Sequence, residues 1–292
     1  MVAPASAFER SQLDAGVAEL RRLGFEAVYD PSIFDRALFT AGDADTRAAA
    51  LMRAFDRAGA AAVMAMRGGY GTGELLPRLD PGRIRQARLP FIGYSDLTAF
   101  HSYCSAIVGL ASVHGPMLEG RFGQGPGEYD VPRFLQSLTE EPLGELAPPG
   151  LDVLRRGEAA GPLVGGTLTM LLASVETPYA FTPPNGHVLF LEDVGERPYR
   201  IHRMLTQWRQ SGRLASASAI VFGQFPKCEE PGSPLTAIDA VRSCLDGFSG
   251  PVVFGFPSGH TTSQMISLPF GVHTRVIAGD HARVVLEEAA AE

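Results

Sequence analysis

Helical and strand-like patterns alternate along the first 110 residues, and this alternation constrains the fold more than any other feature. Helical periodicity covers residues 11–23, 43–58 and 96–108, and short apolar runs cover residues 25–29, 61–66 and 89–92. Strands that alternate with helices form βαβ units around a parallel sheet. The sequence therefore predicts an α/β domain over residues 1–140.

Glycine and proline become frequent after about residue 119, and we interpret residues 141–160 as a linker. From residue 161 onward the chain is again rich in regular patterns. The predicted elements are helices at 131–138, 198–210 and 235–245, strands at 187–190, 217–222 and 252–254, and short strands after residue 265. We therefore expect a second α/β domain over residues 161–292.

The composition excludes several classes of protein. The net charge is −7 and no basic block is present, which argues against a nucleic-acid partner. No apolar run approaches the ~18 residues that span a bilayer, and the N-terminus does not have the pattern of a secretory signal. The three cysteines lie far apart, as in proteins of reducing compartments. We expect a cytoplasmic protein that does not bind membranes.

The run Gly93-Tyr94-Ser95-Asp96 lies between a predicted strand and a predicted helix. A turn of this kind exposes a serine hydroxyl as a nucleophile and directs the next backbone amide, that of Asp96, toward a developing oxyanion. Position 97 is leucine, so the common G-x-S-x-G form is not met. Read alone, the run is more typical of a helix N-cap.

A second glycine-rich run, residues 67–73, follows the strand predicted at 61–66. Its glycines allow backbone amides to approach a ligand closely, so Gly68 or Gly69 is a candidate for a second oxyanion donor. A dinucleotide fingerprint would require glycine where Glu74 stands, and the P-loop Gly-Lys-Ser/Thr is absent. A nucleotide-binding enzyme remains the weaker alternative for this run.

Acidic residues close the apolar strand predicted at 187–190, beginning with Glu192. Functional groups of α/β folds gather outside the carboxyl ends of strands, although solvated charges at a strand end are equally common. No histidine lies at a metal-ligand spacing from these acids, so we expect no metal. Among seven histidines, His114 and His260 lie in loops after apolar segments, and His260 follows a predicted strand.

Taken in order, these motifs resemble one family, the LD-carboxypeptidases or muramoyl-tetrapeptide carboxypeptidases of peptidase family S66. The resemblance runs from end to end of the chain. Its motifs are Val2-Ala-Pro-Ala-Ser6, Arg67-Gly-Gly-Tyr-Gly71, Gly93-Tyr-Ser-Asp96, Gly115-Pro-Met-Leu118, Gly165-Gly166, Thr177-Pro-Tyr179, Leu191-Glu-Asp-Val-Gly-Glu-Arg-Pro-Tyr-Arg200, Arg203-Met-Leu205 and Gly259-His260.

The resemblance implies a catalytic triad of Ser95, Glu192 and His260. It implies a Rossmann-like N-terminal domain that carries the serine and a smaller, β-rich C-terminal domain that carries the other two residues. It also implies homodimers, no cofactor, and metal-independent release of the terminal D-Ala from cytoplasmic murein tetrapeptides during peptidoglycan recycling. A sister branch, similar to microcin C immunity proteins, cleaves acyl-adenylates and is the alternative function.

A carboxypeptidase must also bind a terminal carboxylate, a task that suits arginine. The candidate substrate contacts are Arg67, Tyr70, Thr167, Arg197 and Arg200, with Glu119 or Asp96 for a substrate amine.

Two departures from the family stand out. Many members have asparagine where this chain has Thr167, which puts a substrate contact from that position in doubt. Members also carry several residues of a first strand before the Val-Ala-Pro run, so we expect that the sequence printed here starts late or was shortened. A non-enzymatic binding protein that kept the fold is a further alternative.

Overall fold

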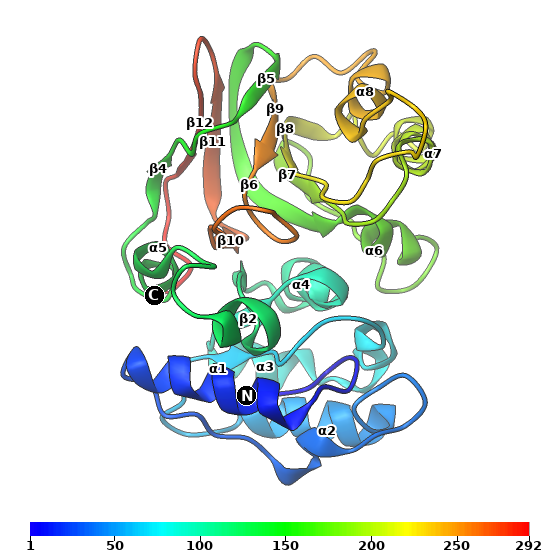
Figure 1. Cartoon of the computed structure of the whole chain (residues 1–292). Helices are drawn as coiled ribbons and strands as arrows, with labels where there is room; N and C mark the ends of the chain where they lie inside the picture. Colours follow the sequence, from blue (N-terminus) through cyan, green and yellow to red (C-terminus); the bar gives the residue numbers. More distant parts are fainter. Residues whose placement is uncertain (292) are drawn as a thin grey trace.

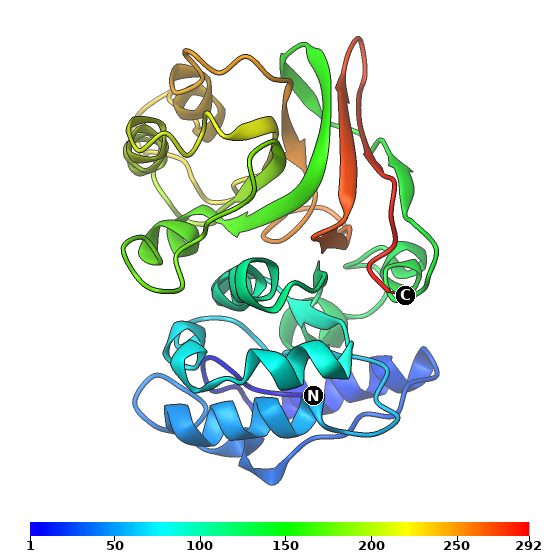
Figure 2. The same ribbon diagram turned by 180° about the vertical axis from the view of Figure 1, so that it is seen from behind.

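The computed structural model describes residues 1–291. Two lobes are visible in Figure 1, where the N-terminal third of the chain forms the lower lobe and most of the remainder forms the upper lobe. Figure 2 shows the same arrangement from behind, with α4 and the segments next to it lying between the lobes. The mixed α/β architecture expected from the sequence is confirmed.

Most helices lie at the predicted positions, but the helices at Pro81–Ala87 and Leu168–Ala173 have no predicted counterpart. The α-helices are α1 (Arg10–Arg22), α2 (Ala44–Phe55), α3 (Pro81–Ala87), α4 (Thr98–Tyr103), α5 (Val131–Gln136), α6 (Leu168–Ala173), α7 (Pro198–Gln210) and α8 (Ala237–Ser243). Short helical turns of other types are η1 (Pro31–Phe34), η2 (Thr72–Glu74), η3 (Leu76–Arg78), η4 (Ser95–Leu97), η5 (Cys104–Val108) and η6 (Leu118–Phe122). No helix within residues 1–291 is both long and apolar enough to cross a membrane.

The lower lobe is built on a small sheet in the order β1-β2-β3-β10. Its strands are β1 (Val63–Met64), β2 (Phe91–Gly93), β3 (Ser112–His114) and β10 (Leu268–Phe270). The first three are parallel, whereas β10 arrives from near the C-terminus and pairs antiparallel with β3. On β2, Phe91 packs on the side of α2 and α4 and Ile92 on the side of α1, so this sheet is buried on both faces.

The upper lobe contains an eight-stranded sheet in the order β4-β12-β11-β6-β7-β8-β9-β5. Its strands are β4 (Gly144–Leu146), β5 (Asp152–Arg155), β6 (Gly157–Thr167), β7 (His187–Glu192), β8 (Ala217–Gly223), β9 (Val252–Phe256), β11 (His273–Ala278) and β12 (Ala282–Leu286). Strands β6 to β9 are parallel, and the outer strands pair antiparallel. Residues 141–160, interpreted above as a linker, hold β4, β5 and the start of β6.

Side chains of β8 alternate between two hydrophobic cores. Ile220 and Phe222 pack with α7 and α8, where Trp208 is almost fully buried, while Val221 packs on the other face with residues of the C-terminal strands. Strands covered on both faces read as continuous apolar runs, which is why the sequence located β7, β8 and β9 correctly.

The strand predicted at residues 25–29 is wrong. The segment pairs with no strand in residues 1–291; its Val28 carbonyl accepts a hydrogen bond from the Met1 ammonium at 2.6 Å. A strand requires a ladder of backbone partners, and a single bond does not supply one.

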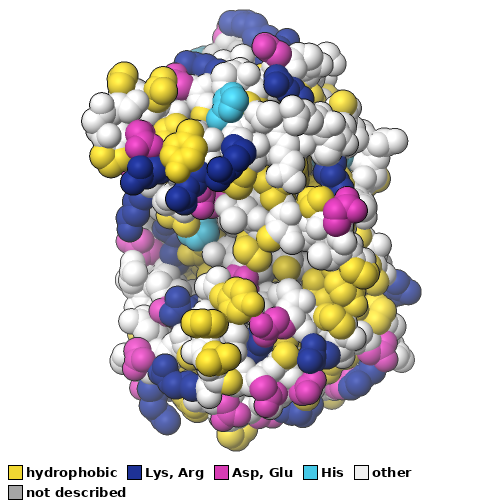
Figure 3. All heavy atoms as spheres, turned by 90° about the vertical axis from the view of Figure 1, so that its right-hand side faces the viewer, with side chains coloured by type: hydrophobic (Ala, Val, Ile, Leu, Met, Phe, Trp, Pro, Cys, Tyr) yellow, Lys and Arg dark blue, Asp and Glu magenta, His cyan; other side chains and the backbone are white. Residues whose placement is uncertain are grey.

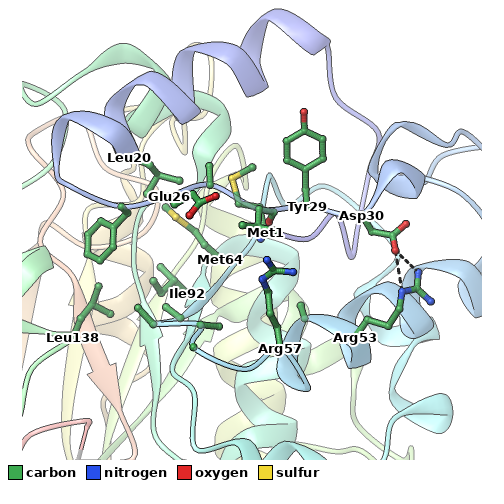
Figure 4. Close-up of a pocket in the computed structure, with 18 of the residues that line it drawn as sticks. Met1, Leu20, Glu26, Tyr29, Asp30, Arg53, Arg57, Met64, Ile92 and Leu138 are labelled. Atoms are coloured by element: carbon green, nitrogen blue, oxygen red, sulfur yellow. Dashed lines mark hydrogen bonds and ion pairs between the residues drawn. The ribbon is translucent and has the colours of Figure 1, made fainter.

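A hollow of about 680 Å³ lies beside this segment (Figure 4). Met1 is one of the residues that line it. Burial, followed by the charge of Arg57, lowers the pKa of the Met1 ammonium to about 6.

Candidate active site

Ser95 lies immediately beyond β2, where the chain turns through η4 into α4. Its φ is +66°, a left-handed conformation that a residue with a Cβ rarely adopts. The N-cap positions of η4 and α4 are Tyr94 and Leu97, and neither carries a side-chain cap. The serine therefore does not cap the helix, and its strained turn has the form of a nucleophile elbow.

The glycine-rich run after β1 comes directly against this turn. A Cβ placed on Gly68 would lie 3.2 Å from Ser95 Oγ and 3.3 Å from the Asp96 nitrogen, so only glycine fits comfortably there. The Asp96 carboxylate is buried and accepts a hydrogen bond of 2.8 Å from the Thr72 amide. This bond joins the two loops, and it leaves the Asp96 carboxylate engaged within the protein instead of facing a substrate amine.

Gly69, the other candidate oxyanion donor, has a φ of +109°. A Cβ at this position would come within 2.5 Å of Ser6 Oγ, which in turn accepts a hydrogen bond of 3.1 Å from the Tyr70 amide. The Val-Ala-Pro-Ala-Ser run therefore supports the glycine turn from behind, while Gly68 faces Ser95.

Glu192 ends β7 and is fully buried. Its Oε2 accepts hydrogen bonds from the backbone nitrogen of His260 at 2.9 Å and from His260 Nδ1 at 2.8 Å, while Oε1 accepts from the Thr167 hydroxyl. Thr167 lies directly beside Glu192 in the β6–β7 ladder. The adjacent acid, Asp193, instead accepts hydrogen bonds from the amide and hydroxyl of Thr169, at 2.9 and 2.6 Å. Only the first of the two neighbouring acids therefore orients His260.

His260 lies in the loop after β9, and 19% of its side chain is exposed. Its ring meets the Tyr94 ring edge to face at 5.1 Å, which brings it next to the Ser95 turn. Within residues 1–291, neither Ser95 Oγ nor His260 Nε2 has a hydrogen-bond partner. Both reactive atoms are therefore available, as is common in catalytic sites without substrate.

Opposing effects set the pKa of His260. Burial is the largest influence and lowers it, but the charge of Glu192, its hydrogen bond and the charge of Asp193 raise it, and the net result is a pKa above 6.5. Only the neutral imidazole can accept a proton. We therefore expect kcat/KM to rise with pH through an acid limb above 6.5, measured as a pH–rate profile on the hydrolysed peptide; a limb below 6.5 would contradict this assignment.

Arg67 directly precedes Gly68, the glycine that packs against Ser95. It forms an ion pair of 3.2 Å with Glu119 and donates a hydrogen bond to the Ala7 carbonyl at 3.2 Å. Burial raises the pKa of Glu119, although the charge of Arg67 opposes this. Arg67 and Glu119 thus place a cation and an acid side by side at the edge of the site.

Arg197 and Arg200 lie at the start of α7, in the other lobe. They pair with Glu230 at 2.9 Å and with Glu196 at 3.5 Å. Figure 3 shows one face of the molecule, on which Lys and Arg side chains lie over both the upper and the lower half. Tyr70 is half exposed, and its hydroxyl donates to Glu74 at 3.2 Å. None of these three side chains has a hydrogen bond, ion pair or ring contact with Ser95, Glu192 or His260.

Two residues missed by the sequence analysis hold the loop that follows His260. Arg121 donates hydrogen bonds to the carbonyls of Thr261 and Ser263, and Gln224 accepts one of 2.9 Å from the Thr262 amide. Gln224 follows β8 as Glu192 ends β7, so the rule of carboxyl strand ends could have found it. No sequence pattern pointed to Arg121, because its partners are backbone carbonyls about 140 residues away along the chain.

The Glu192–His260 pair of the upper lobe thus lies beside the Ser95 turn and the glycine-rich run of the lower lobe. Within residues 1–291, no group of three or more His, Cys, Asp or Glu side chains is placed to hold a metal ion. The arrangement has the parts that acyl transfer through a serine nucleophile requires.

Known proteins resemble this chain over nearly its whole length. The murein tetrapeptide carboxypeptidase of Pseudomonas aeruginosa is 34% identical over 301 residues, covering 97% of this chain and 94% of the relative. The solved muramoyltetrapeptide carboxypeptidase of Oxalobacter formigenes superposes with a TM-score of 0.86 at 28% identity, covering 99% of both chains. The microcin C7 self-immunity protein of Escherichia coli is 26% identical, covering 92% of this chain and 86% of the relative.

Two protein-family models match consecutive parts of the chain. Residues 1–115 match the LD-carboxypeptidase N-terminal domain of peptidase family S66, and residues 160–276 match the LD-carboxypeptidase C-terminal domain. Together with the relatives above, these matches show that the chain belongs to the LD-carboxypeptidase family, peptidase S66.

Proposed function

We propose that the protein is a cytoplasmic serine carboxypeptidase that removes the terminal D-Ala from murein tetrapeptides by cleaving the L,D-peptide bond. The observation that carries this proposal is the pair of hydrogen bonds that Oε2 of buried Glu192 accepts from His260, next to the left-handed turn of Ser95. The names of relatives such as the Pseudomonas enzyme support the choice of murein peptides as the substrate.

In the proposed mechanism, His260 Nε2 accepts the proton of Ser95 Oγ as that oxygen attacks the carbonyl preceding the terminal D-residue. His260 then delivers the proton to the leaving amine, and water hydrolyses the acyl-enzyme by the same route in reverse. Glu192 keeps Nδ1 protonated and stabilises the imidazolium. The Asp96 amide and the Gly68 or Gly69 amide stabilise the oxyanion, and loss of one such donor costs about 10²–10³ in rate.

Arg67 is the arginine we favour for the substrate's terminal carboxylate, because it borders the glycine turn that faces Ser95. We expect Arg67→Ala to raise KM about 10–10²-fold with a smaller effect on kcat, the loss expected for a hydrogen-bonded charge. Steady-state kinetics on a tetrapeptide measures this. Arg22→Ala, which removes a comparable Arg–Glu pair on α1, is the control, and an unchanged KM for Arg67→Ala would reassign the carboxylate site.

The direct test is mass spectrometry of a murein tetrapeptide after incubation with the protein. We expect loss of one alanine, and we expect the same product after treatment with EDTA. Release of a different fragment, or activity lost to EDTA and restored by zinc, would contradict the proposal.

A second candidate function is hydrolysis of peptidyl or aminoacyl adenylates, which the match to the microcin C7 self-immunity protein favours. It would use the same triad, so assays of a tetrapeptide and a peptidyl-adenylate analogue in parallel distinguish the two. A nucleotide-dependent enzyme that uses the glycine-rich turn is the weaker alternative. A thermal shift with NAD or ATP would be its signature.

We also propose a homodimer, which sedimentation equilibrium can test.

A further inference from the structure

His114 connects the lobe that carries Ser95 to the loop that carries His260. It ends β3, and its Nδ1 lies 3.0 Å from Ser258 Oγ, two residues before His260. Both side chains are fully buried. This hydrogen bond therefore crosses between the lobes, within two residues of the proposed base.

The same histidine is fixed relative to the nucleophile. In the small sheet His114 pairs in register with Gly93, two residues before Ser95. The next residue, Gly115, donates a backbone hydrogen bond of 3.2 Å to the Gly93 carbonyl. A short path of strand pairing and one side-chain bond therefore runs from the Ser95 turn to the His260 loop.

Gly259 shows how closely the loop is held. Its φ is +74°, and a Cβ there would lie 2.8 Å from both His114 Cε1 and Glu192 Cδ. Real Cβ atoms essentially never come that close to other heavy atoms. The backbone before His260 thus passes between the His114 ring and the Glu192 carboxylate, with room for a glycine only.

The surroundings of His114 keep its ring uncharged. Phe270 stacks on it at 5.0 Å, and Tyr94 approaches edge to face at 6.0 Å. Burial lowers the pKa of His114 well below its usual value, and the neighbouring His101 and His260 lower it further. The remaining nitrogen, Nε2, is buried without a hydrogen-bond partner within residues 1–291. A neutral ring can bond Ser258 without placing a second cation beside His260.

We propose that His114 is a positioning residue for His260: through Ser258 it fixes the Ser258–Gly259 segment against Glu192 and so sets the distance between base and nucleophile. This inference rests on the proposed triad of Ser95, Glu192 and His260. A displacement of about 1 Å in a catalytic group costs on the order of 10²-fold in rate, so the contact matters for turnover even though His114 does not touch substrate.

The test compares two buried serines, each bonded to a histidine Nδ1. Ser258→Ala removes the partner of His114, and Ser112→Ala removes the partner of His101, a bond of 2.8 Å that does not reach the His260 loop. We expect Ser258→Ala to lower kcat about 10-fold or more with KM nearly unchanged. Ser112→Ala should leave kcat nearly unchanged, because His101 keeps its other bond, of 2.8 Å, to the Gly93 carbonyl. Equal kcat values for the two variants would overturn the proposal.

Variants of His114 itself give a second, independent readout. His114→Ala should lower kcat about as much as Ser258→Ala, and the double variant should be no slower than the slower single variant, because both remove one interaction. His114→Asn places a nitrogen near the position of Nδ1 and should restore much of the rate. Rates that multiply in the double variant would contradict a shared contact. If His114→Ala does not fold, Ser258→Ala and His114→Asn still decide the question.

The pH profile separates positioning from a general loss of structure. A loosened loop weakens the Glu192–His260 bond, so the acid limb of kcat/KM should move down toward 6.5 in Ser258→Ala. The ionisable groups around His114 are His101, His260, Tyr94 and, across Gly259, Glu192. A limb that stays in place while kcat falls would indicate a structural defect and overturn the inference.

The rate of labelling of Ser95 by a fluorophosphonate is measured in parallel. If wild-type protein does not hydrolyse the tetrapeptide, the proposed function fails. The positioning role is then judged from the labelling rate, which requires only the triad. Slower labelling of Ser258→Ala than of Ser112→Ala would support the role of His114, and equal labelling would overturn it.

Discussion

Ser95→Ala is expected to abolish hydrolysis of an L,D-tetrapeptide while leaving the fold intact. The substitution removes only Oγ, which has no hydrogen-bond partner within residues 1–291, and it keeps the Cβ that the left-handed turn already accommodates. In serine peptidases, loss of the nucleophile lowers kcat on the order of 10⁶-fold. The measurement is release of D-Ala, with circular dichroism and thermal unfolding to verify the fold.

A matched control for this variant is Ser105→Ala, in the η5 turn that follows α4. It removes a hydroxyl from the same lobe, so it should retain full activity. Appreciable D-Ala release by Ser95→Ala would disprove the role of Ser95 as nucleophile. Loss of activity in both variants would instead indicate that this lobe tolerates no change.

Glu192→Gln is expected to lower kcat about 10⁴-fold, the effect of the corresponding acid-to-amide change in serine proteases. A glutamine can present an N–H to His260 Nδ1, which favours the imidazole tautomer whose Nε2 carries the proton and cannot accept another. The variant also loses the charge that raises the pKa of His260. What remains of the activity should therefore show an acid limb shifted to lower pH.

Asp193→Asn is the control that the structure provides, because this acid adjoins Glu192 but bonds Thr169 instead of His260. Burial raises the pKa of Asp193 to about 6, so a neutral side chain is tolerated there at modest cost. We expect kcat near the wild-type value, with some loss of thermal stability. A larger loss of kcat from Asp193→Asn than from Glu192→Gln would mean that the wrong acid had been assigned to the triad.

The helices and the buried strands were readable from the sequence because local periodicity reflects burial. Helix α7 has the predicted bounds, and β7 and β8 begin at the predicted residues. The segment at 25–29 failed because a strand also needs a partner, and no local pattern contains that information. Residues 141–160 read as a linker for a related reason. The short edge strands β4 and β5 are flanked by glycine and proline, and the sequence does not show the strands with which they pair.

At the site, the sequence nominated Ser95, Glu192 and His260, but local residues alone favoured a helix cap for the serine. The positive φ of Ser95 and the glycine packed against it distinguish an elbow from a cap, and both depend on how β1 and β2 lie side by side. The choice of Glu192 over Asp193 likewise follows from which side of the strand end faces the His260 loop.

The sequence by itself determined the α/β class, most of the regular elements and the residues able to carry the chemistry, because these follow from burial periodicity and from side-chain type. The tertiary structure alone decided which of those residues meet. The lobe of the Ser95 turn is joined to the lobe of His260 by β10, which enters the lower sheet from near the C-terminus, and by the His114–Ser258 bond. Contacts between residues 144 positions apart leave no local trace in a single sequence, since nothing near either residue depends on the other until the chain has folded.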